Sequence, residues 1–159
     1  MISPHGGTLV SRVIPSSERN AAQAHARTLP VIEMNAREAS DLLLMAIGAM
    51  SPLDGFMGRD AYESVLEHMR LPSGHVWSLP VTLAVSDTAV AQRPTPFAAA
   101  LRAPQGGIVG IMSVEELYRP DKMREATLAL GTGDEAHPGV QYLKTTGGTY
   151  AGGKVWLLE

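Results

Sequence analysis

Two stretches of the sequence hold polar side chains in settings suited to binding a ligand. The first is residues 51–57, SPLDGFM, in which Pro52 fixes φ and restricts Ser51 to extended geometry, and in which the Asp-Gly pair tolerates positive φ. We expect a rigid corner between two helices that holds Ser51, Asp54 and Phe56 at a surface or cleft. A simple helix–helix connection without further function predicts the same pattern, and both interpretations stay open.

The second stretch is residues 131–140, GTGDEAHPGV. Pro138 holds His137 in an extended conformation and the glycine after it permits a sharp reversal, which predicts an imidazole at the tip of a loop. Thr132 and Asp134 lie close to it in sequence. Two interpretations are open here as well: His137 contacts a substrate, or its ring hydrogen-bonds the adjacent backbone and locks the loop.

Residues 148–154, GTYAGGK, have the glycine and lysine spacing of a phosphate-binding loop. However, Val155 stands where Mg²⁺ coordination needs Ser or Thr, and strand-like residues follow where a helix should begin. We therefore interpret this segment as a glycine-rich turn. The GTG at residues 131–133 lacks the third glycine of a dinucleotide fingerprint, so it predicts no nucleotide site either.

Other site chemistries find little support in the sequence. The five histidines show no i, i+4 pairing and no carboxylate at metal-ligand spacing, and there is no cysteine. No Ser-His-Asp arrangement can be assembled from spacing. We therefore predict no catalytic residue, no metal site and no cofactor. The residues expected to bind a ligand or form an interface are Ser51, Asp54, Phe56, Thr132, Asp134 and His137.

Before the corner, the sequence predicts a strand over residues 8–14 and a short helix over 18–27, capped by Ser16 or Ser17. A short extended segment follows at 29–32. Asn35 and Glu38 form a capping box, and apolar residues at helical spacing continue to Gly48. This segment has the clearest helical pattern in the chain.

After the corner, Asp60 is expected to cap a helix that buries Tyr62, Val65, Leu66 and Met69 on one face. Residues 76–85 have a strand pattern that Pro80 interrupts. Further expectations are a hairpin of 97–102 with 107–112, one turn from Ser113 to Tyr118, a helix over 122–130 capped by Asp121, and a closing strand at 155–158. Trp77 and Trp156 fall in strand patterns and are expected in the core.

These elements predict an α+β fold with a small, partly closed barrel. A length of 159 residues, 45% of them apolar, favours one domain over residues 1–159. The net charge of −3 is spread without basic runs, so we expect no nucleic-acid partner. No signal peptide or membrane-spanning stretch is apparent in the sequence, which predicts a cytoplasmic protein without a membrane partner.

Several stretches together resemble one family, the N-terminal domain of ATP sulfurylase, also called sulfate adenylyltransferase. Their order and spacing cover nearly the whole chain. The motifs are PHGGTL at residues 4–9, GAMSPLDGFM at 48–57, WSLPVTL at 77–83, YRPDK at 118–122, GTGDEAHPGV at 131–140 and YAGG at 150–153.

This resemblance implies a PUA-like mixed β-barrel with flanking helices. In the family, this domain precedes a nucleotidyltransferase domain that makes adenosine 5′-phosphosulfate and pyrophosphate from ATP and sulfate, a step of sulfate assimilation. The family's Gln-x-Arg-Asn-Pro and His-Asn-Pro-His motifs, which hold sulfate and the ATP phosphates, have no counterpart in these residues. Since that reaction depends on positioned cationic donors, we predict that this chain alone does not catalyse it.

Two interpretations of function follow. In the first, the nucleotidyltransferase domain is absent from this chain, and the chain acts in packing, oligomerisation or partner binding, with a catalytic nucleotidyltransferase domain or subunit, or a second copy, as partner. In the second, it is a stand-alone PUA-like protein with its own binding of a small anion or adenylate, or its own enzymatic activity. RNA binding, a third alternative, rests on analogy of fold and is disfavoured by the acidic balance.

Overall fold

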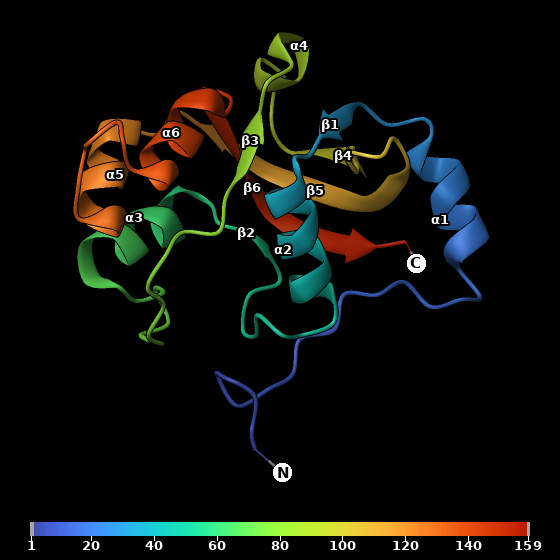
Figure 1. The fold of residues 1–159 in the computed structure, drawn as a ribbon. Coiled ribbons are helices and arrows are strands. Elements are labelled where there is room, and N and C mark those ends of the chain that lie inside the picture. The colour runs from blue at the N-terminus through green and yellow to red at the C-terminus, as the bar shows by residue number, and fades with distance from the viewer. Residues whose placement is uncertain (1, 159) are drawn as a thin grey trace.

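A mixed sheet of six strands forms the centre of the computed structural model, which describes residues 2–158 (Figure 1). Its strands follow the order β1-β4-β5-β6-β2, and β3 also pairs with β6. Only β1 and β4 are parallel, and the other pairs are antiparallel. The strands are β1 (Val31–Glu33), β2 (Gly55–Phe56), β3 (Leu83–Val85), β4 (Phe97–Arg102), β5 (Ile108–Tyr118) and β6 (Thr149–Leu157).

Within residues 2–158, six helices flank this sheet. Helix α2 packs on β6, α1 packs on β5, and α3, α5 and α6 form a group in which α5 contacts both neighbours (Figure 1). They are α1 (Arg19–Ala26), α2 (Ala36–Ala46), α3 (Arg59–His68), α4 (Thr88–Ala91), α5 (Lys122–Leu130) and α6 (Pro138–Thr145). The predicted α+β class with a mixed sheet and flanking helices is confirmed. The sheet is not closed into a barrel, and β1 and β2 lie at the two ends of its strand order.

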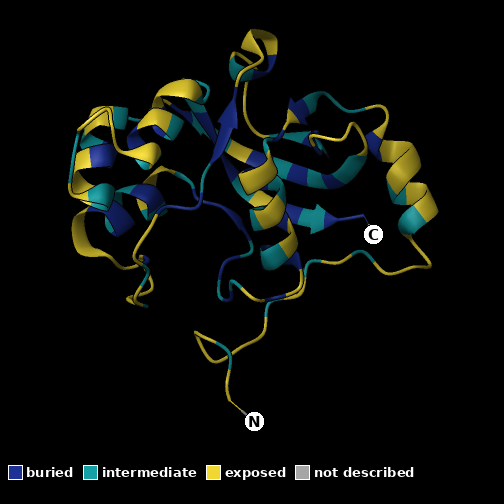
Figure 2. Cartoon of the chain, in the orientation of Figure 1, coloured by how far each residue is buried: buried dark blue, intermediate teal, exposed yellow. Residues whose placement is uncertain are grey.

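The core lies between the sheet and the helices that cover it, as the dark blue segments of Figure 2 show. Burial of aliphatic side chains there stabilises the fold by about 1.5–3 kcal/mol each. A cluster of three tyrosines, Tyr62, Tyr118 and Tyr150, joins α3 to β5 and β6 with ring centroids 5.5–5.9 Å apart. The largest fully buried side chains also include Ile32, Leu42, Met45, Leu83, Leu101, Met112 and Val114.

Elements with strong local signals form as predicted. The capping box of α2 is present in full: the Asn35 side chain accepts from the Glu38 amide, and the Glu38 carboxylate accepts from the Asn35 amide. Asp121 caps α5 through the amides of Met123 and Arg124, and Gly131 ends it in the left-handed conformation. The hairpin forms as β4 and β5.

Several expectations before residue 70 are wrong. Residues 8–14 form no strand but an extended arm with one bridge, between Val13 and Leu157, because the amide of Arg12 bonds to the carbonyl oxygen of Ala46 instead of continuing the pairing with β6. Neither Ser16 nor Ser17 caps α1, which begins after Glu18 without a side-chain cap. Helix α3 begins after Gly58 rather than at a cap by Asp60. Met69 is exposed as the left-handed C-cap of α3 instead of sharing its buried face.

Later in the chain the differences come from tertiary pairing. The strand expected over 76–85 is reduced to Leu83–Val85, because Pro80 and the residues around it leave the sheet. The turn expected from Ser113 is instead the second half of β5, which continues to Tyr118 against β6. The closing strand begins at Thr149, six residues earlier than expected, and α6 was not predicted.

Candidate functional site

Ser51 in the predicted corner is buried and has a structural role. Its hydroxyl donates to the carbonyl oxygen of Gly48 at 2.7 Å and accepts from the amide of Val10 at 3.0 Å. The side chain therefore ties the N-terminal arm to the end of α2. The corner is also fastened to the sheet, since the Tyr118 hydroxyl donates to the carbonyl oxygen of Met57 at 2.9 Å.

Two cationic side chains lie close to the carboxylate of Asp54. Its carboxylate lies 2.7 Å from the Arg12 guanidinium and 3.9 Å from the Lys154 ammonium, and Arg12 in turn stacks over the Trp156 ring at 5.4 Å. Trp156 is half-buried rather than fully in the core, because the guanidinium forms part of its cover. The charge of Asp54 is thus already compensated within the chain.

Gly55 is needed for a reason other than the one predicted. It does not adopt a positive φ; instead a Cβ there would lie 1.9 Å from the carbonyl oxygen of Gly153. The same closeness explains Gly152 and Gly153 of the segment 148–154, which lies mostly in β6: a Cβ at Gly152 would lie 2.4 Å from the Cα of Gly58, and one at Gly153 would lie 1.9 Å from the carbonyl oxygen of Ser113. This segment is therefore neither a phosphate-binding loop nor the turn that we expected.

Asp54 and Phe56 line one pocket of about 360 Å³ at the β2–β6 crossing. Glu115, Glu116 and Lys154 also line it. The Glu116 carboxylate accepts from the amide of Arg59 at the start of α3, the position where an external anion would otherwise bind. The anion-binding capacity of this helix end is therefore used by the chain itself.

The stretch around His137 forms the N-terminal cap of α6. The His137 Nδ1 accepts from the amide of Gly139 at 3.1 Å, as the backbone-locking interpretation expects. Thr132 accepts from the amide of Asp134 at 3.0 Å, and Asp134 accepts from that of Ala136 at 2.9 Å. These three residues line neither the Asp54 pocket nor the hollow that Ser51 borders, so the six residues are not gathered. Their binding of a ligand stays a prediction.

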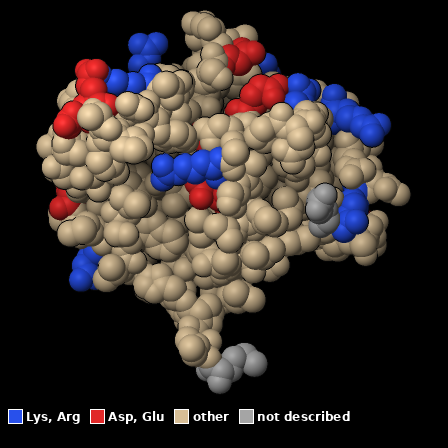
Figure 3. Space-filling view, in the orientation of Figure 1, with Lys and Arg blue, Asp and Glu red and all other residues tan. Residues whose placement is uncertain are grey.

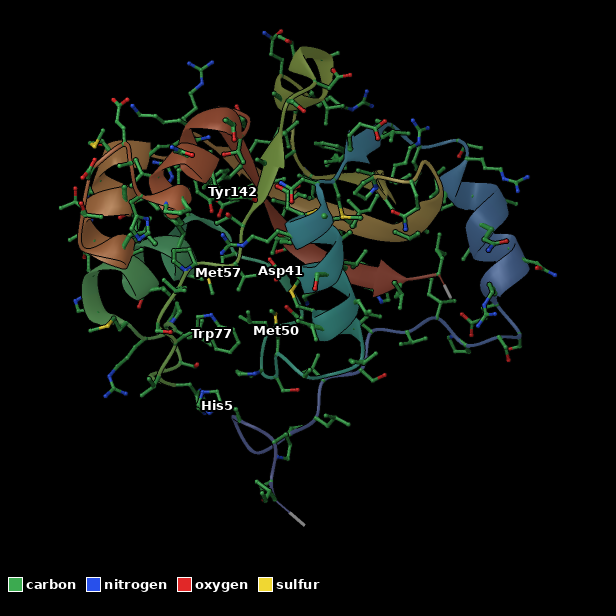
Figure 4. The ribbon with its side chains drawn as sticks, viewed as in Figure 1. His5, Asp41, Met50, Met57, Trp77 and Tyr142 are labelled. Atoms are coloured by element: carbon green, nitrogen blue, oxygen red, sulfur yellow. The ribbon has the colours of Figure 1, made fainter. Side chains whose placement is uncertain are left out.

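A hollow of about 500 Å³, which we call the groove, lies between the start of α2, the residues that follow α2, and the segment 76–81 (Figure 4). No motif in the sequence predicts it. Asp41 borders it from α2, Ser51 from the corner, and His5 from the N-terminal arm. Its apolar lining comes from Met50, Val76, Trp77, Leu79, Pro80 and Val81.

The segment 76–81 exposes apolar side chains because Pro80 and its neighbours do not join the sheet. Val76 is 56% and Leu79 is 43% exposed. Trp77 is only half-buried, which corrects the expectation that it lies in the core. The face of the molecule drawn in Figure 3 shows few charged side chains in its lower part, whereas most of the charged groups lie higher on this face and at its edges. Apolar surface of this kind is typical of an interface.

One carboxylate borders this apolar surface. Asp41 is half-buried, and desolvation raises its pKa, an effect that Arg37 only partly offsets. Within residues 2–158, its side chain has no hydrogen-bond or ion-pair partner. At the other end, the Nε2 of His5 lies 3.0 Å from the carbonyl oxygen of Val76. The groove can therefore bind an apolar surface that carries a hydrogen-bond donor or a cation. Elsewhere as well, the described residues offer no group of three or more His, Asp or Glu side chains that could hold a metal ion.

Comparison with known proteins assigns the region. The family model described as "PUA-like domain" matches residues 2–159. The chain is 46% identical over 158 residues to a sulfate adenylyltransferase from Symbiobacterium thermophilum, and 44% identical over 159 residues to a probable bifunctional SAT/APS kinase 2 from Sorangium cellulosum. These matches cover 99% and 100% of this chain but only 40% and 27% of the relatives. The resemblance to the N-terminal domain of sulfate adenylyltransferase is thus confirmed.

A solved structure shows the same fold. The hexameric APS kinase from Thiobacillus denitrificans superposes with a TM-score of 0.74 at 26% identity, over 99% of this chain and 27% of that one. In each relative, therefore, most of the polypeptide lies outside the matched region. Within residues 2–158, no helix has both the length and the apolar character needed to cross a membrane.

Proposed function

Because the chain belongs to the PUA-like domain family, as matched over residues 2–159, we propose that it is a non-catalytic domain that docks on the nucleotidyltransferase part of a sulfate adenylyltransferase. The groove is the docking surface. The observation that carries this proposal is the apolar segment 76–81, which a domain working alone would leave in water.

The composition of the groove supports a protein partner. Val76, Trp77 and Leu79 supply an apolar centre, and Asp41 supplies a polar group at its border, as in interfaces with an apolar core and a polar rim. A docked surface would shield the two exposed aliphatic side chains from water, at about 25 cal/mol for each Å² of apolar area.

The lack of catalytic equipment in the sequence supports the non-catalytic role. The motifs Gln-x-Arg-Asn-Pro and His-Asn-Pro-His do not occur in the 159 residues. Two arginines beside the corner are already engaged within the chain: Arg12 pairs with Asp54, and Arg59 stacks over Tyr118 at 5.8 Å. Adenylylation of sulfate requires several cationic donors aimed at one triphosphate, and we propose that the partner domain provides them.

A chimera tests this function. The matched segment of the Symbiobacterium thermophilum enzyme is replaced by this chain, and sulfate-dependent release of pyrophosphate from ATP is measured for the chimera and for the isolated chain. We expect release from the chimera and none from the chain. Robust turnover by the pure chain would overturn the non-catalytic role.

Thermal unfolding of the same chimera tests docking. A docked domain should unfold together with the catalytic part in one transition, at a temperature above that of the isolated chain. If instead the chain unfolds in the chimera at the temperature it shows alone, the two parts do not stabilise each other and docking is excluded.

A further inference from the structure

A small cavity of about 90 Å³ lies beyond the inner end of the groove, between α5, α6 and the segment 79–80. It shares Arg37, Leu79 and Pro80 with the groove, so the two hollows adjoin. Its apolar wall is formed by Ala129, Leu130 and Leu143. Its polar lining comes from Arg37, Glu125 and Tyr142, and Figure 4 shows Tyr142 beside the groove.

Glu125 is buried, with only 5% of its surface exposed, and only part of its carboxylate is used. Its Oε2 accepts from the hydroxyls of Tyr62 at 3.0 Å and Tyr150 at 2.9 Å. Among residues 2–158, its Oε1 has no hydrogen-bond partner. Within residues 2–158 the fully buried side-chain nitrogen and oxygen atoms without a partner belong to Arg12 and Arg19, so the Oε1 of Glu125 is accessible from the cavity that Glu125 lines. Desolvation raises the pKa of Glu125.

The nearby cations do not neutralise this carboxylate by direct contact. Lys122, one turn earlier on α5, directs its ammonium to the carbonyl oxygen of Leu143 at 2.8 Å and to both oxygens of Thr146 at 2.7 Å, which uses all three protons. Arg37 stacks over the Tyr142 ring at 5.0 Å and forms no ion pair with Glu125. It is exposed, so solvent screens its charge at the mouth of the cavity.

We propose that this cavity binds a primary ammonium group on an unbranched alkyl stem. The ammonium donates to the free Oε1 of Glu125 and supplies the missing counter-charge. The stem lies along Ala129, Leu130 and Leu143. The volume admits roughly six water-sized groups, which suits a short alkylammonium and excludes a nucleobase. This site is independent of the docking role proposed above.

Binding of butylammonium tests the site, with neutral 1-butanol as the matched probe. Both are titrated into the ¹⁵N-labelled chain at constant ionic strength, and the amide shifts of residues around the cavity are followed by NMR. We expect butylammonium to bind in the millimolar range and at least about fivefold more tightly than butanol. Equal affinity of the two probes would overturn the proposal, because the carboxylate would then contribute nothing.

Two variants locate the site. Glu125→Gln keeps the shape and the acceptor for both tyrosines, and should lower butylammonium affinity to that of butanol while leaving butanol binding unchanged. Ala129→Leu fills the cavity and should abolish binding of both probes. Amide spectra that match the wild type elsewhere show that each variant is folded. Unchanged butylammonium binding in either folded variant would place the amine outside this cavity and contradict the proposal.

Two further probes identify the source of the alkylammonium. Nα-acetyl-lysine N-methylamide represents a lysine side chain on a polypeptide, and 1,4-diaminobutane represents a free diamine. Tighter binding of the blocked lysine assigns the site to a basic side chain of a partner, whereas tighter binding of the diamine assigns it to a free amine. Failure of both probes to bind would overturn the proposal.

Discussion

The carboxylates at the corner, residues 51–57, have partners within the chain, whereas the carboxylates at the groove and its adjoining cavity lack a cationic partner. In the corner, Asp54 faces Arg12 and Lys154, and the neighbouring Glu116 accepts from the start of α3. Around the groove, Asp41 and Glu125 lie partly or fully out of water without a cation in contact, and their pKa values are raised. At the corner, therefore, the carboxylates are used in contacts that hold the chain together. We propose that the groove and the cavity are free to bind a partner or a ligand.

Gly153→Ala is the substitution for which we expect the largest effect. It tests the close packing of β6, in which Gly153 pairs with Phe56 of the corner. A Cβ at this position would lie 1.9 Å from the carbonyl oxygen of Ser113, and the backbone has a φ of 149°, which L residues rarely adopt. The variant should lose about 3 kcal/mol or more of stability, or fail to fold, in urea unfolding. Gly148→Ala is the control, because no atom lies within 4 Å of its Cβ. Equal losses in the two variants would contradict the close-approach argument.

Ser51→Ala tests whether the hydroxyl of Ser51 holds the chain together, because in a ligand-binding site this hydroxyl would be unpaired. The substitution removes both hydrogen bonds of the buried hydroxyl and leaves the Val10 amide unpaired. We expect a loss of about 1–2 kcal/mol in the free energy of unfolding. The exposed Ser40 on α2 provides the control, since Ser40→Ala should be neutral or slightly stabilising. A neutral Ser51→Ala would show that the hydroxyl does not support the arm.

The pH dependence of Glu125→Gln is the smallest of the three effects. Because the folded pKa of Glu125 is raised above its ordinary value of 4.5, the unfolded chain releases its proton first, so stability is lost as the pH rises from about 4.5 through the folded pKa. Tyr62, Tyr150, Lys122 and Arg37 face this carboxylate in both proteins. The variant should therefore lose less stability than the wild type between pH 4.5 and pH 8 in urea titrations. Parallel pH profiles would contradict a raised pKa at Glu125.

Much of the fold was predictable because its signals are local. The Asn35–Glu38 capping box, the Asp121 cap and the hairpin turn each lie within a few residues of the element that they define. Features that depend on distant partners were missed. The second half of β5 is a strand because β6 lies beside it, and residues 8–14 remain irregular because their pairing with β6 is limited to a single bridge, between Val13 and Leu157.

The candidate sites show the same difference between local signals and contacts with distant residues. Residues 51–57 stand out in the sequence because Pro, Asp and Gly are typical of a corner, but the structure uses Gly55 for the close approach of Gly153 and Asp54 for the ion pair with Arg12, which are requirements of packing. The groove and the cavity have no such motif, since Asp41, Trp77 and Glu125 come together only in the folded chain. One local signal was available: Pro80 interrupts an apolar run, which keeps Leu79 out of the sheet and at the surface.

The central claim is that the groove docks on a catalytic domain. Two matched substitutions test it: Leu79→Glu in the groove, and Leu128→Glu on α5, where the leucines are 43% and 47% exposed. In the isolated chain each should change stability by less than about 0.5 kcal/mol.

The decisive measurement is thermal unfolding of the chimera that carries each substitution. We predict that Leu79→Glu separates the single transition into two, because the domain no longer docks, whereas Leu128→Glu leaves one transition at an unchanged temperature. A chimera that keeps one unshifted transition with Leu79→Glu, or that separates with Leu128→Glu alone, would contradict docking through the groove.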